Sequence, residues 1–302
     1  MKTVKDKFSS YISPLMAYIT DLPHIDNYPL DEIAPRIDIV VMRITSIIIV
    51  CLILLTASFA SAAENDSYFR DYIVSYPHTV GKAISAPLNW ETSDWLKAGG
   101  VIAICGSLYL LDEEIRDFIQ DNRTDSGDNI MTGFKQFGEG KYMIPAMGAT
   151  ILAGCLTGSE KTTDTGLLCL KSFILAESVT QGLKIATQRQ RPDKENGNQF
   201  WNNSSFIINN NAFPSGHATL VWSLAPILAH QYRNMGWVPP VAYSIAALTS
   251  YSRLNDDKHW ASDVFFGAVI GYVSAKLVLA DTPVLTLAPD IEHQGLAFQF
   301  EF

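Results

Sequence analysis

Basic residues are in the minority in this sequence. Its 302 residues include 22 lysines and arginines against 31 aspartates and glutamates, which gives a formal net charge of −9. A nucleic-acid-binding surface needs a basic footprint, so the acidic balance argues against nucleic acid as a partner. It also means that cations able to bind an anion must be concentrated locally.

Cysteine is scarce as well, and the sequence has no internal repeat or low-complexity tract. Of the four cysteines, Cys51 lies in an apolar N-terminal run, which leaves Cys105, Cys155 and Cys169 for at most one disulfide. We expect buried free thiols in helix cores instead. Glycine and proline contents are ordinary, so neither a fibrous nor a disordered protein is indicated, and the length suits one large domain or two small ones.

The N-terminal region predicts an exported protein. A basic start at Arg43, an apolar run over 44–59 and a small-x-small exit at 60–62 are typical of a secretory signal peptide, here residues 42–62. An uncleaved membrane anchor is the alternative. We expect translation to begin at Met42 and residues 1–41 to be an extension that comes from a misplaced start. The protein is then periplasmic or otherwise associated with the cell envelope.

Six segments have apolar residues that recur every three or four positions, which predicts helices. They are Ala98–Leu111, Tyr142–Leu156, Gly166–Ala186, Ala218–Tyr232, Val241–Tyr251 and Ala261–Ala280. We therefore expect an all-α fold, a helical bundle of about six core helices over residues 98–281. Residues 63–97 are predicted to be a polar approach segment. The acidic stretches that begin at Asp112 and Thr124 are expected to separate the first two helices.

The C-terminal tail has a different pattern. Val284–Leu287 and Leu296–Phe302 are apolar, the second with clean alternation, and turn residues lie between them. Residues 282–302 are therefore predicted to form a short β-hairpin.

Most of the apolar runs are shorter than the roughly 20 residues that a bilayer requires. The best candidate to span is Ala261–Ala280, whose Gly267 and Gly271 stand one turn apart and would also allow close helix packing. A water-soluble or peripherally attached domain is our prediction, and an integral membrane protein is the alternative.

Lys184 and Arg191, followed by Pro192, form the first of three motifs that point to an anion site. Seven residues are two helical turns, so both side chains are expected on one helix face. Pro192 disfavours helix at Arg191 and places its guanidinium at or near the helix end. Arginine offers two-pronged geometry for an oxyanion, and lysine offers a mobile point charge.

The second motif, Pro214-Ser215-Gly216-His217, precedes the apolar run from Ala218. Ser215 is a good helix N-cap, and Gly216 allows close approach of the backbone. Free N–H groups at a helix N-terminus bind anions readily, and His217 in the first turn would be aimed at the same place. By itself, this motif would more often be a helix cap.

Arg253, His259 and Asp263 make up the third motif. His259 and Asp263 are four residues apart and are expected on one face of a helix. A carboxylate bonded to one imidazole nitrogen fixes the tautomer and leaves the other nitrogen as a nucleophile. Arg253 lies within reach of the same anion. Because no cluster of metal-ligand carboxylates accompanies the motifs, they predict transfer of a phosphate-sized oxyanion without a metal.

The three motifs, in this order, resemble the signature of the phosphatidic-acid phosphatase type 2 superfamily, which shares its site with vanadium haloperoxidases and bacterial non-specific acid phosphatases. The resemblance covers roughly residues 98–281 and implies an α-helical bundle. One departure is the strongly polar stretch over 254–258, where membrane members of the family are usually apolar.

The resemblance also implies a role for each site residue. His259 would attack phosphorus and carry a phosphohistidine, and Asp263 would orient it and stabilise its positive charge. His217 would protonate the leaving oxygen and then activate water. No metal or other cofactor is implied. The phosphate-binding groups would be Lys184, Arg191, Arg253 and the amides of Ser215 and Gly216.

The predicted function is thus a metal-independent phosphatase that hydrolyses phosphate monoesters or diphosphates of a lipid or a small molecule. A vanadate-dependent haloperoxidase and a non-enzymatic anion-binding envelope protein are the alternatives. Loops such as Asp193–Ala212 select the organic part of the substrate, and the sequence leaves that choice and the oligomeric state open.

Overall fold

A computed structural model describes residues 67–201, 211–281, 284–290 and 295–301. The predicted signal peptide, the extension before it and the middle of the loop between the first two motifs lie outside these residues.

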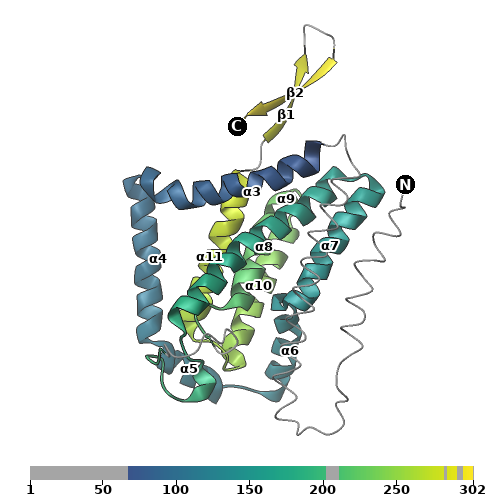
Figure 1. The fold of residues 1–302 in the computed structure, drawn as a ribbon. Helices are drawn as coiled ribbons and strands as arrows, with labels where there is room; N and C mark the ends of the chain where they lie inside the picture. The colour runs from purple at the N-terminus through teal and green to yellow at the C-terminus, as the bar shows by residue number, and fades with distance from the viewer. Residues whose placement is uncertain (1–66, 202–210, 282–283, 291–294, 302) are drawn as a thin grey trace, which may run out of the picture. The chain divides into compact units, whose positions relative to one another are not determined.

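Each of the six predicted helices is present, and the expected all-α fold is confirmed. They are α4 (Thr92–Leu110), α7 (Gly140–Thr157), α8 (Glu160–Thr187), α9 (Gly216–Gln231), α10 (Val238–Asn255) and α11 (Ala261–Ala280). Helix α9 packs against α8, α10 and α11, and α7 packs against α8. Figure 1 shows α8, α9, α10 and α11 running side by side as a bundle.

Within the described residues, three further helices lie in segments where no helix was predicted. Helix α3 (Ser67–Ser85) occupies part of the expected approach segment, and α5 (Asp112–Asp121) and α6 (Asp125–Lys135) follow α4. The acidic stretches expected to separate helices instead begin them. Negative charge is favourable in the first turn of α5, and the Thr124 side chain caps α6. Short 3-10 turns connect the longer helices: η2 (Ala86–Asn89), η3 (Gln136–Gly138) and η4 (Pro192–Lys194).

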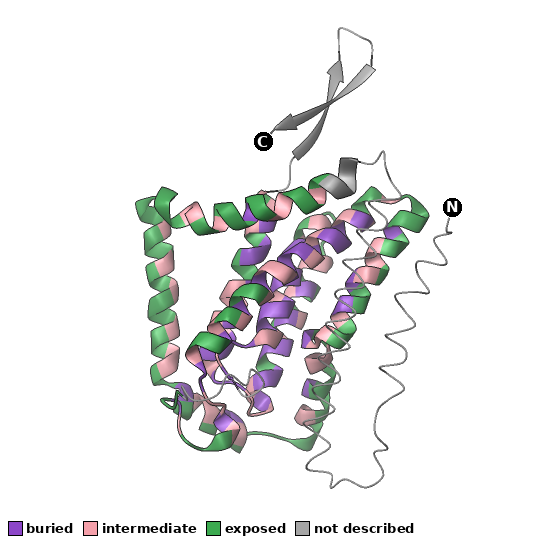
Figure 2. Ribbon diagram, in the orientation of Figure 1, coloured by how far each residue is buried: buried purple, intermediate pink, exposed green. Residues whose placement is uncertain are grey.

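The core lies where α8, α9 and α11 face one another (Figure 2). Leu167 on α8, Ile227 on α9 and Val278 on α11 are almost fully buried. Burying a side chain of this size contributes about 1.5–3 kcal/mol relative to leaving it exposed. These three helices therefore form a rigid frame for groups attached to their ends.

Two glycines bring α11 into direct contact with the backbone of α9. A side chain at Gly267 would collide with the carbonyl of Ser215, and one at Gly271 would collide with the carbonyl of Thr219. The close packing predicted for these glycines is thus confirmed. It holds the second motif, at the start of α9, against the third motif, at the start of α11.

The C-terminal tail contains two strands in the region where a hairpin was predicted. Strands β1 (Val284–Asp290) and β2 (Gly295–Glu301) pair antiparallel, with Val284 opposite Glu301.

The three described cysteines are free thiols. Cys169 is buried in α8, but Cys105 is half-buried and Cys155 is exposed. The expectation of buried thiols is therefore right only for Cys169, whose pKa burial raises to about 12.

Among the described helices, α11 is long and apolar enough to cross a membrane, as predicted. Helices α4 and α5, bent by 59° where they meet, would give a second candidate if the pair counted as one span. Helix α11 is also a buried helix of the bundle, so its apolar composition serves packing as well.

Candidate active site

Hydrogen bonds join the three motifs at the end of the bundle where α8 ends and α9 and α11 begin. The amide of Ala212, two residues before the second motif, donates to the carbonyl of Arg189 (2.7 Å), which lies in the first motif. The amide of Ser215, in the second motif, donates to the carbonyl of Asp263 (3.0 Å) in the third. Segments distant in the sequence are therefore neighbours in the fold.

His259 is buried just before α11, and a backbone group fixes its tautomer. Its Nδ1 lies 2.7 Å from the carbonyl oxygen of Ala212. A carbonyl only accepts hydrogen bonds, so Nδ1 carries the proton and Nε2 carries the lone pair.

The predicted hydrogen bond between His259 and Asp263 is absent from this described site. His259 Nδ1 and Asp263 Oδ2 are 4.0 Å apart. Because α11 begins at Ala261, His259 lies before the helix, and the helical spacing argument does not apply to it. Asp263 instead accepts from the amide of Trp260 (2.8 Å) and from Arg189 Nη1 (2.6 Å). Burial raises the pKa of Asp263 to about 6, and Arg189 opposes that rise.

Lys184 and Arg191 lie on different elements, so the prediction of a shared helix face was wrong. Helix α8 ends at Thr187, Gln188 takes a left-handed backbone conformation (φ 48°), and Arg191 is extended before η4. Pro192 disfavours helix at the residue before it, which explains the extended backbone of Arg191.

The three predicted cations nevertheless act on the same imidazole. Burial lowers the pKa of His259 well below its usual value, and the charges of Lys184, Arg191 and Arg253 lower it further. Lys184 is itself buried and donates to the carbonyl of Asn211 at 2.8 Å. Burial and the nearby arginines lower the pKa of Lys184 to about 8. The site is thus strongly electropositive although the chain is acidic.

Four predicted site residues carry a buried polar atom with no hydrogen-bond partner among the described residues. They are Nε of Arg191, Oγ of Ser215, Nε2 of His217 and Nε of Arg253. Native proteins pair the great majority of their buried polar groups, so four such atoms in one site need an explanation. All four can donate a hydrogen bond when His217 is protonated, which suits an anion.

Ser215 differs from its predicted role in two ways. Its side chain makes no capping hydrogen bond in α9, and its amide is already bonded to the carbonyl of Asp263. The hydroxyl rather than the amide is therefore the group that Ser215 can offer to an anion. The amide of Gly216 opens α9 and has no acceptor within the helix.

His217 lies beside a carboxylate that the sequence motifs did not indicate. Its Nε2 is 3.3 Å from Glu139 Oε1, so the two form an ion pair when the imidazole is protonated. Burial lowers the pKa of His217, while Glu139 acts to raise it. The contact with His217 lowers the pKa of Glu139 to about 2. A side chain at Gly138 would overlap the imidazole, so this glycine makes room for it.

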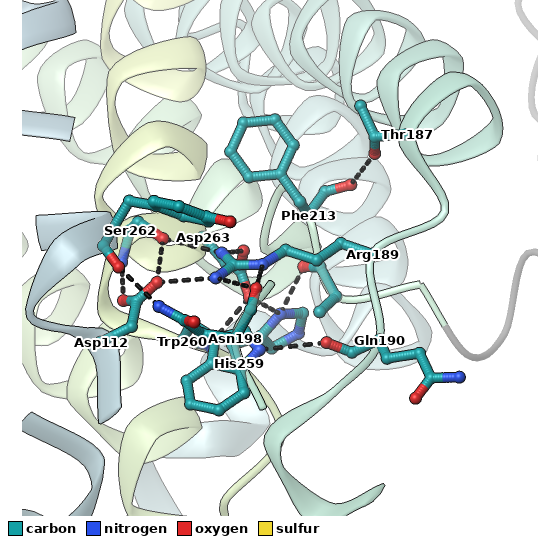
Figure 3. Close-up of polar contacts among 12 residues, drawn as sticks. Asp112, Thr187, Arg189, Gln190, Asn198, Phe213, His259, Trp260, Ser262 and Asp263 are labelled. Carbon is teal, nitrogen blue, oxygen red and sulfur yellow. Dashed lines mark hydrogen bonds and ion pairs between the residues drawn. The ribbon is translucent and has the colours of Figure 1, made fainter. Parts of the chain in front are cut away.

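Sequence reasoning also missed Arg189 and Asp112, which form a buried network with Asp263 (Figure 3). Arg189 stands inside the first motif, two residues before Arg191, and a buried arginine there gives no separate sequence signal. Asp112 was expected only to end a helix. Nothing in local spacing could link it to the motifs.

The comparison with known proteins agrees with these motifs. Residues 165–286 match the model of the PAP2 superfamily. The matched residues include all three motifs. The resemblance stated from the three motifs is thereby confirmed.

One curated relative and two solved structures are similar to this chain. A stretch of 68 residues is 34% identical to the lipid A 1-phosphatase of Porphyromonas gingivalis, and it covers 22% of this chain and 15% of that protein. The crystal structure of Aquifex aeolicus LpxE is 23% identical over 56% of this chain and 95% of its own, with a TM-score of 0.44. That of the first transmembrane PAP2 type phosphatidylglycerolphosphate phosphatase from Bacillus subtilis is 24% identical over 60% and 93%, with a TM-score of 0.48.

The polar stretch over 254–258, which departs from the usual PAP2 pattern, ties the third motif to neighbouring elements. Its four polar side chains each contact another part of the site's surroundings. The pairs are Asn255 with Asp128 (2.8 Å), Asp256 with Arg253 (2.9 Å), Asp257 with Arg116 (2.6 Å) and Lys258 with Asp193 (2.7 Å). The polarity of this stretch therefore has an intramolecular explanation, and it does not by itself argue for or against a membrane.

Proposed function

We propose that this protein is a phosphatase that hydrolyses phosphate esters through a phosphohistidine on His259. The observation that carries the proposal is the set of buried polar atoms on Arg191, Ser215, His217 and Arg253 that have no hydrogen-bond partner among the described residues. Three of these residues, Arg191, His217 and Arg253, also act electrostatically on the imidazole of His259. Groups of this kind can bind the oxygens of a phosphoryl group, and hydrogen bonds that join arginine to an oxyanion are among the strongest in proteins.

In the first step, Nε2 of His259 attacks phosphorus, because Nδ1 is occupied by its hydrogen bond to Ala212. The P–N bond forms as the P–O bond to the leaving group breaks, and protonated His217 gives its proton to the leaving oxygen. The lowered pKa of His259 keeps this imidazole neutral, as a nucleophile must be.

In the second step, His217 takes a proton from water as the water oxygen attacks phosphorus. The P–N bond then breaks, inorganic phosphate leaves, and both histidines return to their starting states. Glu139, 3.3 Å from His217, favours the protonated imidazole that the next cycle needs.

Charge stabilisation accounts for most of the expected rate, since phosphoryl transfer needs mainly positioning and electrostatics. Lys184, Arg191 and Arg253 supply three positive charges, and the Ser215 hydroxyl and the Gly216 amide supply further donors. Loss of one such donor typically costs on the order of a hundredfold in rate. Asp263, 4.0 Å from Nδ1, would stabilise the positive charge on His259 through space rather than by a direct hydrogen bond.

The substrate class that we propose is a lipid phosphate monoester, by analogy with the curated relative, which is a lipid A 1-phosphatase. A lipid substrate requires that the protein associate with a membrane, either peripherally or through spanning helices. Cleavage of the predicted signal peptide during export would put this activity on the exported side of the membrane.

Phosphate release by the purified protein tests this proposal. A lipid phosphate monoester, a polyprenyl diphosphate and a soluble phosphate ester are each assayed with and without detergent, and again with a metal chelator. We expect the lipid monoester in detergent to be hydrolysed fastest, with no effect of the chelator. Rapid quenching with radiolabelled substrate should trap an acid-labile, alkali-stable label on His259. A label on any other residue would overturn the proposed nucleophile.

A further inference from the structure

We propose that Arg189 and Asp112 are positioning residues that hold His259 in place from both sides. This inference rests on the proposed function, and it concerns two side chains that do not touch the reacting atoms. Both are fully buried in the end of the bundle that carries the site.

The first contact runs through the start of α11. Arg189 Nη1 donates to Asp263 (2.6 Å) and to the hydroxyl of Ser262 (2.8 Å), and Asp263 accepts from the amide of Trp260. Trp260 directly follows His259 in the chain. The guanidinium therefore fixes the backbone on the α11 side of the imidazole.

The second contact runs through the loop before α9. The carbonyl of Arg189 accepts from the amide of Ala212 (2.7 Å), and the carbonyl of Ala212 is the group that binds His259 Nδ1 (2.7 Å). One residue thus positions both the segment that contains His259 and the acceptor that sets its tautomer.

Asp112 completes the network from the start of α5. Its carboxylate accepts from Arg189 Nη2 (2.7 Å), from the amide of Ser262 (2.9 Å) and from the hydroxyl of Ser262 (2.6 Å). Nε and Nη2 of Arg189 also donate to the carbonyl of Asn198, so each nitrogen of the guanidinium has an acceptor. Figure 3 shows Arg189 between Asp112 and Asp263.

Aromatic rings exclude water from this network. The guanidinium lies 4.8 Å from the ring centroid of Tyr109, 5.3 Å from that of Trp201 and 5.5 Å from that of Trp260. In such surroundings an ion pair interacts strongly, and loss of one member leaves its partner uncompensated. A lysine could keep the charge at position 189 but not the planar fork that binds two carboxylates at once.

The network holds two carboxylates and one guanidinium, so a negative charge is left over beside His259. That charge favours the positive phosphohistidine proposed above. Asp263 must be ionised to supply it, and the rate should fall as the pH drops through the pKa of Asp263, which is about 6. The titratable or charged groups that act on Asp263 or its neighbours here are Arg189, Lys184, Arg191, Asp112, His259 and Cys105.

The test uses the acid limb of the pH–rate curve, the part where the rate falls as the pH decreases. Two variants should move this limb in opposite directions. Asp112→Asn removes a negative charge near Asp263, lowers the pKa of Asp263 and should move the acid limb to lower pH. Arg189→Met removes the positive charge, raises that pKa and should move the limb to higher pH. In both variants kcat should fall on the order of a hundredfold, as expected for a small displacement of a reacting group, with KM within about threefold. Arg189→Lys should recover part of the kcat lost in Arg189→Met.

Lys171→Met, at the buried ion pair with Asp281, is the matched control, because it should change thermal stability but neither kcat nor the acid limb. If the acid limb lies at the same pH in the wild type, Asp112→Asn and Arg189→Met, the positioning role is overturned. It is also overturned if the loss of kcat in each variant only parallels its loss of thermal stability. NMR of the histidine-labelled protein measures the environment of the His259 imidazole without any substrate. A wild type that hydrolyses no phosphate ester overturns the proposed function, while a His259 signal unchanged in Asp112→Asn overturns the positioning role.

Discussion

An aspartate with a buried carboxylate lies at each end of α11. Comparing the two distinguishes an ion pair that only stabilises the fold from one that lies beside the candidate active site. Asp263 at the N-terminal end binds Arg189 at 2.6 Å, and Asp281 after the C-terminal end lies 2.8 Å from Lys82 and 3.5 Å from Lys171. Both carboxylates are almost inaccessible to water. Burial of an unpaired carboxylate is strongly unfavourable, so each needs its cations.

The two aspartates connect α11 to different parts of the protein. Asp281 connects α11 to α3 and α8, since it also accepts from Thr79 and pairs with His78, and Lys171 in turn donates to Ser75. Asp263 connects α11 to groups around His259. A buried ion pair is therefore not a sign of an active site by itself. The difference lies in the donors on Arg191, Ser215 and Arg253, which have no hydrogen-bond partner among the described residues.

The largest effect is expected at the N-terminal end of α11, from His259→Ala. This change removes the proposed nucleophile, so phosphate release should fall to the background rate. Phosphate release and the melting temperature would be measured on the same preparation. A variant that keeps near-normal turnover would refute the assignment of His259.

Arg253→Ala should have the next largest effect. Loss of one oxyanion donor is expected to reduce kcat/KM on the order of a hundredfold. Arg233→Ala is the control, because Arg233 is exposed just after the C-terminal end of α9, whereas the site lies at the start of α9, and its loss should leave the rate unchanged. Equal rates for the two variants would show that Arg253 does not stabilise the transferring group.

At the C-terminal end of α11, Lys171→Met should lower stability without lowering activity. Removing one partner of a buried ion pair costs about 3 kcal/mol, and Asp281 keeps Lys82 as a remaining partner. Urea unfolding gives the free energy, and kcat should stay at the wild-type value. Lys97→Met, at an exposed ion pair with Asp94, should change the free energy of unfolding much less. A large loss of kcat in Lys171→Met would show that the ion pair at the C-terminal end of α11 also affects activity, which contradicts a purely stabilising role.

Glu139→Gln should have the smallest effect, a shift in the alkaline limb of the pH–rate curve. His217 must be protonated to donate its proton, so the rate falls as the pH rises through its pKa. Glu139 raises that pKa against the effect of burial, and the substitution should therefore move the alkaline limb to lower pH. Glu160→Gln, exposed at the start of α8, is the control. A limb that stays in place would argue against His217 as the proton donor.

Local sequence patterns predicted most of the helices but not which helices pack against one another. The three- and four-residue periodicity of α8 through α11 depends on residues close in the chain, so it can be read from the sequence. Helices α5 and α6 were missed because their acidic residues suggested breaks, whereas the same residues stabilise helix starts. Lys184 and Arg191 were placed on one helix because spacing alone does not reveal the left-handed turn at Gln188.

The sequence alone determined which chemical groups the three motifs contain: two histidines, three cations and an aspartate, each recognisable from short-range spacing. Only the tertiary structure decided which group each of them meets. Ala212 rather than Asp263 binds His259, Glu139 lies beside His217, and Arg189 joins Asp263 to Asp112. These contacts join residues far apart in the chain. They depend on how α5, α8, α9 and α11 pack, and local spacing does not encode that packing.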